Sequence, residues 1–189
     1  ENLGHSYSPA LHALFGDYDY ALFEVSPDRL GDFLRVRDFQ GLNVTIPYKT
    51  TMLAICDDLT ETAATIGSVN TVLKQLDGSL LGDNTDAAGF EGMVWKSRIR
   101  ILGRKCLVLG SGGASLSAQY VLRKLGAGEV VVISRTGENN YDNLDRHQDA
   151  AVIVNATPVG MYPNTAASPV DLRQFPHCEG VLDLIYNPA

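Results

Sequence analysis

The chain has 189 residues, 45% of them hydrophobic and 20% charged, and a mean hydropathy of −0.02, a composition that excludes intrinsic disorder and collagen-like structure. The 15 basic and 22 acidic residues leave a net charge of −7, which argues against nonspecific nucleic-acid binding, because such binding needs clustered lysine and arginine. A small anionic ligand is still compatible with this charge, because it needs only one local positive site.

The first part of the chain alternates between predicted strands and predicted helices. Residues 21–25 and 42–46 are apolar runs typical of strands, and residues 27–37 between them have the amphipathic spacing of a helix. Residues 49–66 predict a longer helix that ends at Gly67, because glycine commonly terminates helices.

A hairpin is predicted next. Residues 69–73 and 80–82 flank Asp77-Gly78, a dipeptide typical of two-residue hairpin turns. Residues 85–95 then predict a helix that joins the two halves of the chain.

The second half predicts a parallel sheet. Residues 106–109 and 130–133 are continuous apolar runs, as expected for strands buried on both faces, and residues 114–125 between them predict a helix. Residues 151–155 and 180–185 predict two further strands. This succession is typical of a Rossmann-like, doubly wound α/β lobe.

A glycine-rich turn, Gly110-Ser111-Gly112-Gly113-Ala114, follows the first of these strands and opens the predicted helix. Glycines at such a turn let the backbone approach a pyrophosphate, whose charge meets the free amides of the helix N-terminus. The strict dinucleotide fingerprint has glycine where Ser115 stands, so a purely structural glycine turn is the alternative.

The next predicted strand ends in Ser134-Arg135-Thr136. An NAD site usually has a carboxylate here to hold the ribose hydroxyls, whereas an arginine pairs with the 2′-phosphate of NADP. This segment favours NADP, the alternative being a solvated loop arginine.

Two further positions combine a charged residue with a helix start. Lys49 follows Asn43-Val44-Thr45-Ile46-Pro47-Tyr48, at a place where the helix macrodipole disfavours a cation, which suggests a catalytic proton donor. Asp86 opens the joining helix. The alternatives are an exposed lysine and an ordinary N-cap aspartate.

A loop near the start of the chain offers two hydroxyls, Ser6 and Ser8, before a predicted helix. Two hydroxyls close together can hold a carboxylate. By themselves they indicate only a loop and a helix cap.

Seven motifs, taken in this order, resemble those of the shikimate dehydrogenase family. They span nearly the whole chain, and the set in this order is highly specific although each motif is short. The motifs are His5-Ser6-Tyr7-Ser8-Pro9, Asn43-Val44-Thr45-Ile46-Pro47-Tyr48-Lys49, Ile66-Gly67-Ser68-Val69-Asn70-Thr71, Gly82-Asp83-Asn84-Thr85-Asp86-Ala87-Ala88-Gly89, the Gly110–Ala114 turn, Ser134-Arg135-Thr136, and Asn155-Ala156-Thr157-Pro158-Val159-Gly160-Met161.

The resemblance implies an NADP-dependent oxidoreductase that acts on a CH–OH group. The implied reaction is the reversible reduction of 3-dehydroshikimate to shikimate, in the pathway to chorismate and the aromatic amino acids. The implied catalytic pair is Lys49 and Asp86. The implied substrate contacts are Ser6, Ser8, Thr45, Lys49, Asn70, Asp86 and Tyr186. The implied cofactor contacts are Glu61, Gly110, Ser111, Gly112, Gly113, Ala114, Ser134, Arg135, Thr136, Thr157, Met161 and Leu184.

The same resemblance implies the domain organisation. Residues 1–85 are expected to form an α/β lobe that binds substrate and carries the catalytic pair, residues 86–98 a connecting helix, and residues 99–189 the Rossmann-like NADP-binding lobe. The family also places substrate and cofactor contacts, a glutamine and a glycine among them, on C-terminal helices. None follows Ala189, so we expect a chain truncated at its C-terminus.

Two other functions remain open. One is a quinate/shikimate dehydrogenase that uses NAD, against which Arg135 argues. The other is a truncated or fused module that binds ligand without turnover. Either a monomer or a homodimer is compatible with the sequence, and no nucleic-acid or membrane partner is expected.

The three cysteines, Cys56, Cys106 and Cys178, are widely spaced and odd in number, which makes a reducing cytoplasm the default compartment. The four histidines lack the spacing of metal ligands, so no metal site is predicted. No apolar run reaches the roughly 18 residues that a membrane span needs, and no signal peptide opens the sequence.

Overall fold

The computed structural model describes Leu3 and residues 6–187. The chain divides into two compact units, Glu1–Gln40 and Gly41–Ala189. The lobe boundaries expected from the sequence remain a prediction. His5 of the serine loop lies outside the described residues, as do residues 1–2, 4 and 188–189.

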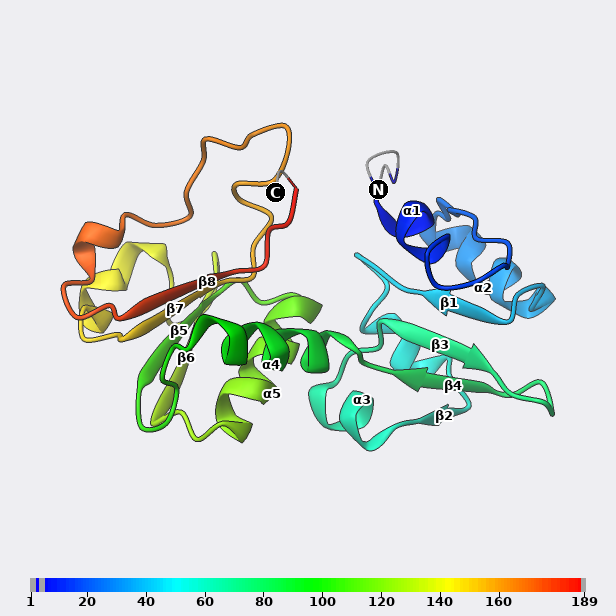
Figure 1. Cartoon of the computed structure of the whole chain (residues 1–189), viewed down its shortest axis with the longest axis horizontal. Helices are drawn as coiled ribbons and strands as arrows, with labels where there is room; N and C mark the ends of the chain where they lie inside the picture. Colours follow the sequence, from blue (N-terminus) through cyan, green and yellow to red (C-terminus); the bar gives the residue numbers. More distant parts are fainter. Residues whose placement is uncertain (1–2, 4–5, 188–189) are drawn as a thin grey trace. The chain divides into compact units, whose positions relative to one another are not determined.

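The first unit contains two helices, α1 (Ser8–His12) and α2 (Pro27–Val36) (Figure 1). Helix α2 begins with a proline after an extended serine and ends at Arg37, whose φ of 50° is left-handed, so the predicted helix is confirmed. His12 has a packing role. Its ring stacks on that of Tyr20 with centroids 4.0 Å apart, and its Nδ1 is 2.7 Å from the Tyr18 hydroxyl.

The predicted strand at residues 21–25 is wrong. Within the described residues this segment is irregular and joins neither sheet. An apolar run becomes a strand only where a neighbouring strand supplies ladder hydrogen bonds, and the described part of the first unit contains no strand. Phe23 instead packs against Phe33 of α2, with ring centroids 5.2 Å apart.

The second unit begins with a mixed sheet of four strands, β1 (Gly41–Asn43), β2 (Asp58–Leu59), β3 (Thr71–Lys74) and β4 (Leu80–Asp83), in the order β1-β3-β4-β2. The predicted hairpin is confirmed, with antiparallel β3 and β4 joined through Gly78 at a φ of 86°. Strand β1 also pairs antiparallel with β3, but it ends three residues before the predicted limit of 46.

The long helix predicted at residues 49–66 is also wrong. The segment contains the 3-10 helix η1 (Thr51–Ala54), strand β2 and helix α3 (Glu61–Ile66). Strand β2 pairs in parallel with β4, and Thr60 starts α3 by accepting a hydrogen bond from the Ala63 amide at 3.2 Å. Tertiary pairing therefore overrides the local helical pattern.

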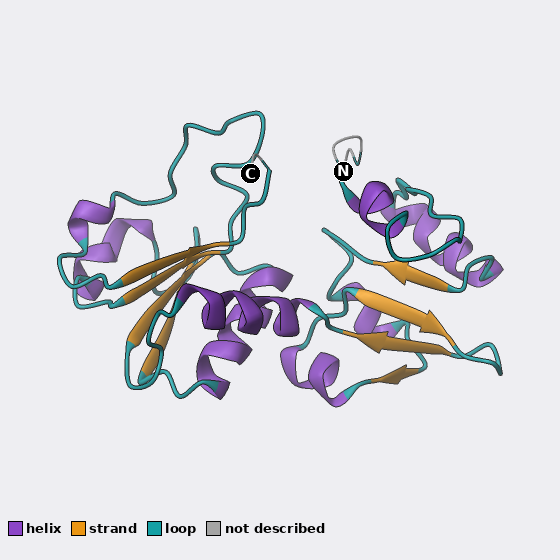
Figure 2. Ribbon diagram, in the orientation of Figure 1, coloured by secondary structure: helices purple, strands orange, loops and turns teal. Residues whose placement is uncertain are grey.

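Helix α4 (Asp86–Ser97) leads into the second sheet, which is built from β5 (Lys105–Leu109), β6 (Glu129–Ile133), β7 (Val152–Asn155) and β8 (Gly180–Asp183). These four strands are all parallel, in the order β6-β5-β7-β8 (Figure 2). Helix α5 (Gly113–Lys124) connects β5 to β6, while the 3-10 helices η2 (Tyr141–His147) and η3 (Leu172–Gln174) precede β7 and β8.

Apolar side chains cover both faces of the parallel sheet. On one face α4 and α5 pack together (Figure 1). Phe90 and Val121 of these helices belong to the same buried cluster as Val108 of β5. On the other face, Leu144 and Phe175 are buried against Leu107. The Rossmann-like lobe predicted from the strand pattern is thereby confirmed. Among the described helices, none is both long and apolar enough to cross a bilayer.

Candidate active site

Three polar side chains meet where the mixed sheet of the second unit ends. The Lys49 ammonium donates a hydrogen bond to Asp86 Oδ2 at 2.5 Å, and Asn70 Nδ2 donates to the other oxygen, Oδ1, at 2.8 Å. The side chains of the ion pair are 17% exposed at Lys49 and 33% at Asp86. The pair is therefore shielded by the protein but still reachable from solvent.

Backbone hydrogen bonds of the sheet bring these residues together. The Val69 amide donates to the carbonyl of Lys49 at 2.8 Å, and the Asn70 amide donates to the carbonyl of Asp83 at 3.0 Å. Since Asp83 ends β4 and Asp86 begins α4, the strand directs the first helical turn towards the lysine. The site thus depends on contacts between residues far apart in the sequence.

Asn70 is itself held in one orientation. Its Oδ1 accepts hydrogen bonds from the Thr85 amide at 2.9 Å and from the Thr71 hydroxyl at 2.9 Å. A backbone N–H can only donate, so the amide nitrogen of Asn70 must face the Asp86 carboxylate. Two donors, an ammonium and an amide, consequently fix that carboxylate.

The alternative interpretation of Asp86 as an ordinary N-cap is wrong. Its two carboxylate oxygens accept hydrogen bonds from Lys49 and Asn70. The amide of Ala87 in the first turn of α4 is instead bound by Asn84 Oδ1, at 3.3 Å. Thr85 is the N-cap residue of α4, and Asp86 is the first residue inside the helix.

The glycine turn fits a pyrophosphate. Gly110 has a φ of 103°, and a Cβ built on it would lie 2.9 Å from the Ala156 carbonyl oxygen. Gly112 precedes α5 in an extended conformation, and among the described side chains none caps this helix. Open backbone amides at the start of a twelve-residue helix attract an anionic group.

Gly113 connects this turn to the ion pair. A Cβ built on Gly113 would lie 3.0 Å from Cδ of Lys49 and 2.9 Å from Oγ of Ser68. The start of α5 thus lies directly against the stem of the lysine, and a side chain at this position would require Ser68 or Lys49 to shift. A cofactor bound at this turn would be close to the lysine–aspartate pair.

The remaining predicted cofactor residues also follow the carboxyl ends of parallel strands, where α/β sheets bind their ligands. Ser134, Arg135 and Thr136 follow β6, and Arg135 is exposed. Among the described carboxylates, none forms an ion pair with it. Burial raises the pKa of Tyr141, and the nearby Arg135 guanidinium acts in the opposite direction.

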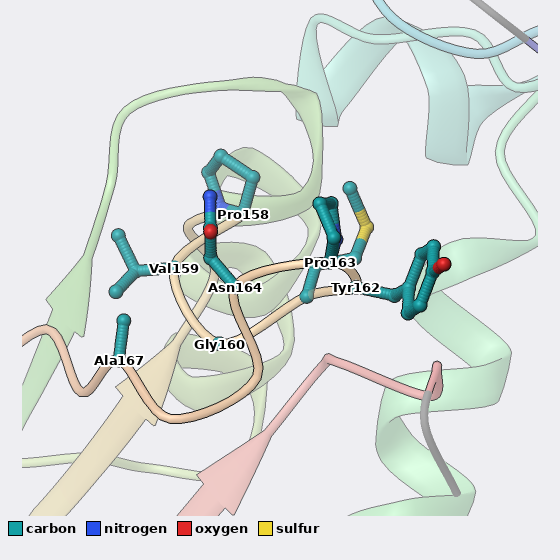
Figure 3. A pocket seen from close by; sticks show the side chains of 8 residues that line it. Pro158, Val159, Gly160, Tyr162, Pro163, Asn164 and Ala167 are labelled. Atoms are coloured by element: carbon teal, nitrogen blue, oxygen red, sulfur yellow. The ribbon is translucent and has the colours of Figure 1, made fainter.

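Thr157 and Met161 follow β7, and Leu184 follows β8. Thr157 donates to Asn155 Oδ1 at 2.7 Å, and its Cγ2 is 3.2 Å from a Cβ built on Gly110. The loop from Pro158 to Ala167 lines an open hollow of about 330 Å³ (Figure 3). Met161 is among its lining residues. The glycine turn after β5 therefore contacts the ends of both neighbouring strands: Gly110 donates to the Ile133 carbonyl of β6 at 2.8 Å and packs against Ala156 and Thr157 after β7.

Several predicted residues lie outside these two clusters. Thr45 is exposed before the turn that leads to Lys49, Glu61 is the exposed first residue of α3, and Tyr186 is 67% exposed after β8. In the first unit, the Ser8 amide donates to Ser6 Oγ at 3.2 Å, so the two serines share one turn before α1. The proposed roles of these residues remain predictions.

Sequence reasoning missed two buried polar residues. Asn84 is 3% exposed, and Asn155 is equally buried where it bonds to Asp183 at 3.1 Å. The only signal available was their type, since asparagine is common before a helix and at strand ends. That signal does not separate a buried asparagine from a solvated one.

The fold and the site together define a class. A parallel sheet whose strand β5 runs through a glycine turn into an uncapped helix, beside a lysine–aspartate pair, is the arrangement of a dinucleotide-dependent oxidoreductase. Similarity to known proteins identifies the family within this class. Residues 1–72 match the shikimate dehydrogenase substrate binding domain.

A shikimate dehydrogenase (NADP(+)) of Clostridium perfringens is 35% identical over 209 residues, an alignment covering all of this chain and 77% of the relative. The crystal structure of shikimate dehydrogenase 1 from Peptoclostridium difficile superimposes with a TM-score of 0.90 at 34% identity, covering 100% of this chain and 76% of the other. The shikimate 5-dehydrogenase from Thermus thermophilus, solved with NADP(H) and shikimate, gives a TM-score of 0.84 at 36% identity, covering 98% and 76%. The chain belongs to the shikimate dehydrogenase family.

Proposed function

We propose that this protein catalyses the reversible NADPH-dependent reduction of 3-dehydroshikimate to shikimate, in the pathway to chorismate and the aromatic amino acids. The observation that carries the proposal is the Lys49–Asp86 hydrogen bond of 2.5 Å, whose lysine packs against Gly113 of the glycine turn. The closeness of the ion pair to the glycine turn supports a proton donor that acts beside a bound dinucleotide. The relatives' names supply the substrate.

The Lys49 ammonium is the proton donor in this proposal. When bound, NADPH supplies a hydride to the carbonyl carbon of the substrate. Negative charge then grows on the carbonyl oxygen, and Lys49 can hydrogen-bond that oxygen and give it a proton. In the reverse direction the same side chain takes the proton back.

Asp86 and Asn70 orient the lysine. The carboxylate holds the ammonium, and the amide of Asn70 holds the carboxylate at 2.8 Å, so Lys49 does not have to be ordered during the reaction. Asn70 and Asp86 also contact the substrate in the proposal. Ser6 and Ser8 hold the substrate carboxylate, and Thr45 and Tyr186 add polar contacts.

The cofactor is held mainly by backbone. The amides of Gly112, Gly113 and Ala114 would hold the pyrophosphate, and Gly110 and Ser111 would form the turn that lets it approach. Arg135, between Ser134 and Thr136, pairs with the 2′-phosphate. Glu61, Thr157, Met161 and Leu184 complete the site. The exposed guanidinium of Arg135 at the end of β6 supports this preference for NADP.

The protein acts on a small molecule, and we place it in the cytoplasm as a monomer or homodimer. The three free cysteines support the reducing compartment in this proposal.

The decisive experiment measures loss of NADPH absorbance when the 189-residue protein is mixed with 3-dehydroshikimate. We expect turnover that is faster with NADPH than with NADH. Turnover with NADH and 3-dehydroquinate in preference would instead favour the quinate-type alternative. Binding of shikimate and NADP by calorimetry without any turnover would contradict the enzymatic proposal and favour a ligand-binding module.

A further inference from the structure

A buried amide joins the two halves of the site. Asn84, only 3% exposed, lies between β4 and α4. Its Nδ2 donates to the Ser68 carbonyl at 2.8 Å, and its Oδ1 accepts from the Ala87 amide at 3.3 Å and from the Ser117 hydroxyl at 3.2 Å. One side chain therefore contacts the segment before β3, the first turn of α4 and the first turns of α5.

Only an amide satisfies these three partners. The Ser68 carbonyl can only accept a hydrogen bond and the Ala87 N–H can only donate one, so the orientation of the Asn84 amide is fixed. An aspartate of the same size would turn a carboxylate oxygen towards a buried carbonyl. An alanine would leave a buried donor and acceptor without partners, which costs more than the hydrogen bonds themselves contribute.

Ser117 extends the connection to the glycine turn. Its hydroxyl, in a side chain that is 1% exposed, is shared between Asn84 Oδ1 and the Gly113 carbonyl, which lie at 3.2 and 3.3 Å. Gly113 is the residue that packs against the stem of Lys49. The chain of contacts from Asn84 through Ser117 thus ends at the residue where glycine turn and ion pair meet.

Asn84 also stands two residues before Asp86. It binds the first turn of α4, which carries that carboxylate, and the first turns of α5, which begin at the cofactor turn. Apolar packing between α4 and α5 includes Ala87 and Leu116 near their N-terminal ends, but such packing is non-directional. A directional hydrogen bond at those ends fixes their separation, because its geometry tolerates little displacement.

We propose that Asn84 is a positioning residue, whose amide sets the distance between the Lys49–Asp86 pair and the glycine turn that binds the cofactor. The inference rests on the proposed function. Asn84 touches neither ligand in this role. It acts through the first turns of the two helices, and its contribution lies in the alignment of the proton donor with the cofactor, where a displacement of about 1 Å can cost roughly a hundredfold in rate.

The test compares Asn84→Asp, Ser117→Ala and the control Ser97→Ala. Ser97→Ala also removes a hydroxyl, which donates to the Val94 carbonyl at 2.8 Å and accepts from the Ile99 amide at 3.2 Å, but at the opposite end of α4. For each protein we would measure kcat, KM for NADPH and for 3-dehydroshikimate, the isotope effect on kcat with 4-deuterated NADPH, and Tm. Kinetics are measured well below the lowest Tm.

Asn84→Asp should lower kcat by about tenfold to a hundredfold and raise the isotope effect, while both KM values change by less than about threefold. Ser117→Ala should do the same to a smaller extent, and Ser97→Ala should leave kcat and the isotope effect unchanged. A lowered Tm with wild-type kcat and isotope effect would overturn the proposal, because a purely structural residue gives that result. If Asn84→Asp does not fold, the result with Ser117→Ala decides in the same way.

The proposed function is tested separately by the wild-type protein. Absence of any turnover by the wild type contradicts the dehydrogenase activity, whereas active wild type with unchanged Asn84 and Ser117 variants contradicts only the positioning role.

Discussion

The ion pair and the cofactor turn are built in opposite ways. Lys49 and Asp86 are 37 residues apart in the sequence and meet through side chains at 2.5 Å. The turn Gly110–Ala114 is five consecutive residues whose backbone conformation follows from β5 and α5. A side-chain site should be abolished by losing one functional group, whereas a backbone site should tolerate changes of side chain and respond to added volume or lost charge.

The largest effect should follow removal of the ion pair. Lys49→Ala should lower kcat by about a hundredfold or more with little change in cofactor binding, because a proton donor acts mainly in the transition state. Asp86→Asn should behave similarly. The double variant should lose much less than the product of the single losses, because the two residues act as a unit. The measurement is steady-state kinetics with NADPH and 3-dehydroshikimate.

An exposed, solvated lysine would make a different prediction. Lys49→Ala would then turn over like the wild type, and Asp86→Asn would only melt earlier. Wild-type turnover in Lys49→Ala would end the proposed mechanism.

A substitution of Arg135 tests whether its positive charge binds the 2′-phosphate of NADP. Arg135→Ala should raise KM for NADP by the equivalent of about 1.5–3 kcal/mol, the range for a hydrogen bond to a charged group, and leave KM for NAD nearly unchanged. Measuring both cofactors is the control within one protein. Equal losses for the two would mean that Arg135 does not read the 2′-phosphate.

Much of the cofactor side could be predicted from the sequence. The β5-α5-β6 unit, the hairpin and the positions of the strand-end loops follow from local apolar runs and glycine signals, so local patterns suffice to predict them. The long helix at residues 49–66 was predicted wrongly because the pairing of β2 with β4 depends on residues more than twenty positions away. The strand at residues 21–25 was wrong because a strand requires a neighbour.

The ion-pair side was predictable only in part. Lys49 and Asp86 were candidates because each occupies a predicted helix start. Their separation in the sequence does not indicate that their side chains are in contact. Asn84 could not be recognised, because burial at 3% and three simultaneous hydrogen bonds are properties of the folded chain. Local sequence patterns therefore do not predict hydrogen bonds between side chains of different secondary-structure elements.

The proposed substrate contacts of Ser6 and Ser8 are also made by side chains, so removing their hydroxyls should weaken substrate binding. Ser6→Ala combined with Ser8→Ala should weaken substrate affinity by the equivalent of about 2 kcal/mol, since each net hydrogen bond contributes about 1 kcal/mol. NADPH binding, followed by fluorescence, should be unaffected. The opposite pattern, with substrate affinity kept and NADPH affinity lost, would assign the loop to the cofactor.

Gly113 lies where the glycine turn contacts Lys49 of the ion pair, so a substitution there tests this contact. Gly113→Ala adds a Cβ 2.9 Å from Ser68 Oγ and 3.0 Å from Lys49 Cδ, so Ser68, Lys49 or the turn must shift. We expect kcat to fall by roughly tenfold, the order expected for a displacement of less than about 1 Å. Gly92→Ala is the matched control, because no atom lies within 4 Å of its Cβ position in α4. That variant should keep its kcat and become more stable by about 0.5–1 kcal/mol. Wild-type kcat in Gly113→Ala would show that the contact does not constrain the lysine.

The smallest effect concerns a histidine beneath the cofactor loops. His147 is 7% exposed, and its Nε2 lies 3.0 Å from Asn139 Oδ1, whose backbone carbonyl accepts a hydrogen bond from the Ser134 amide at 3.1 Å. Among the described residues, no group pairs with its buried Nδ1. Burial holds the pKa of His147 below its ordinary value of 6.5, and the Lys105 ammonium adds to the effect, while the carboxylates of Glu129 and Asp149 act against it.

The unfolded chain therefore takes up a proton at His147 at a higher pH than the folded chain does. The stabilisation is fully present above about pH 6.5 and is lost as the pH falls through the folded pKa. Urea unfolding at about pH 7.5 and about pH 5.5 should show a smaller free energy of unfolding at the lower pH. His147→Gln should reduce this difference. His177→Gln is the control, because its histidine is exposed, and it should leave the difference unchanged. Asn139 holds the loop that begins at Ser134, and this loop belongs to the proposed cofactor site. As the pH falls, KM for NADPH should therefore rise in the wild type and not in His147→Gln. An unchanged pH dependence of stability in His147→Gln would show that other groups are responsible for the loss of stability in acid.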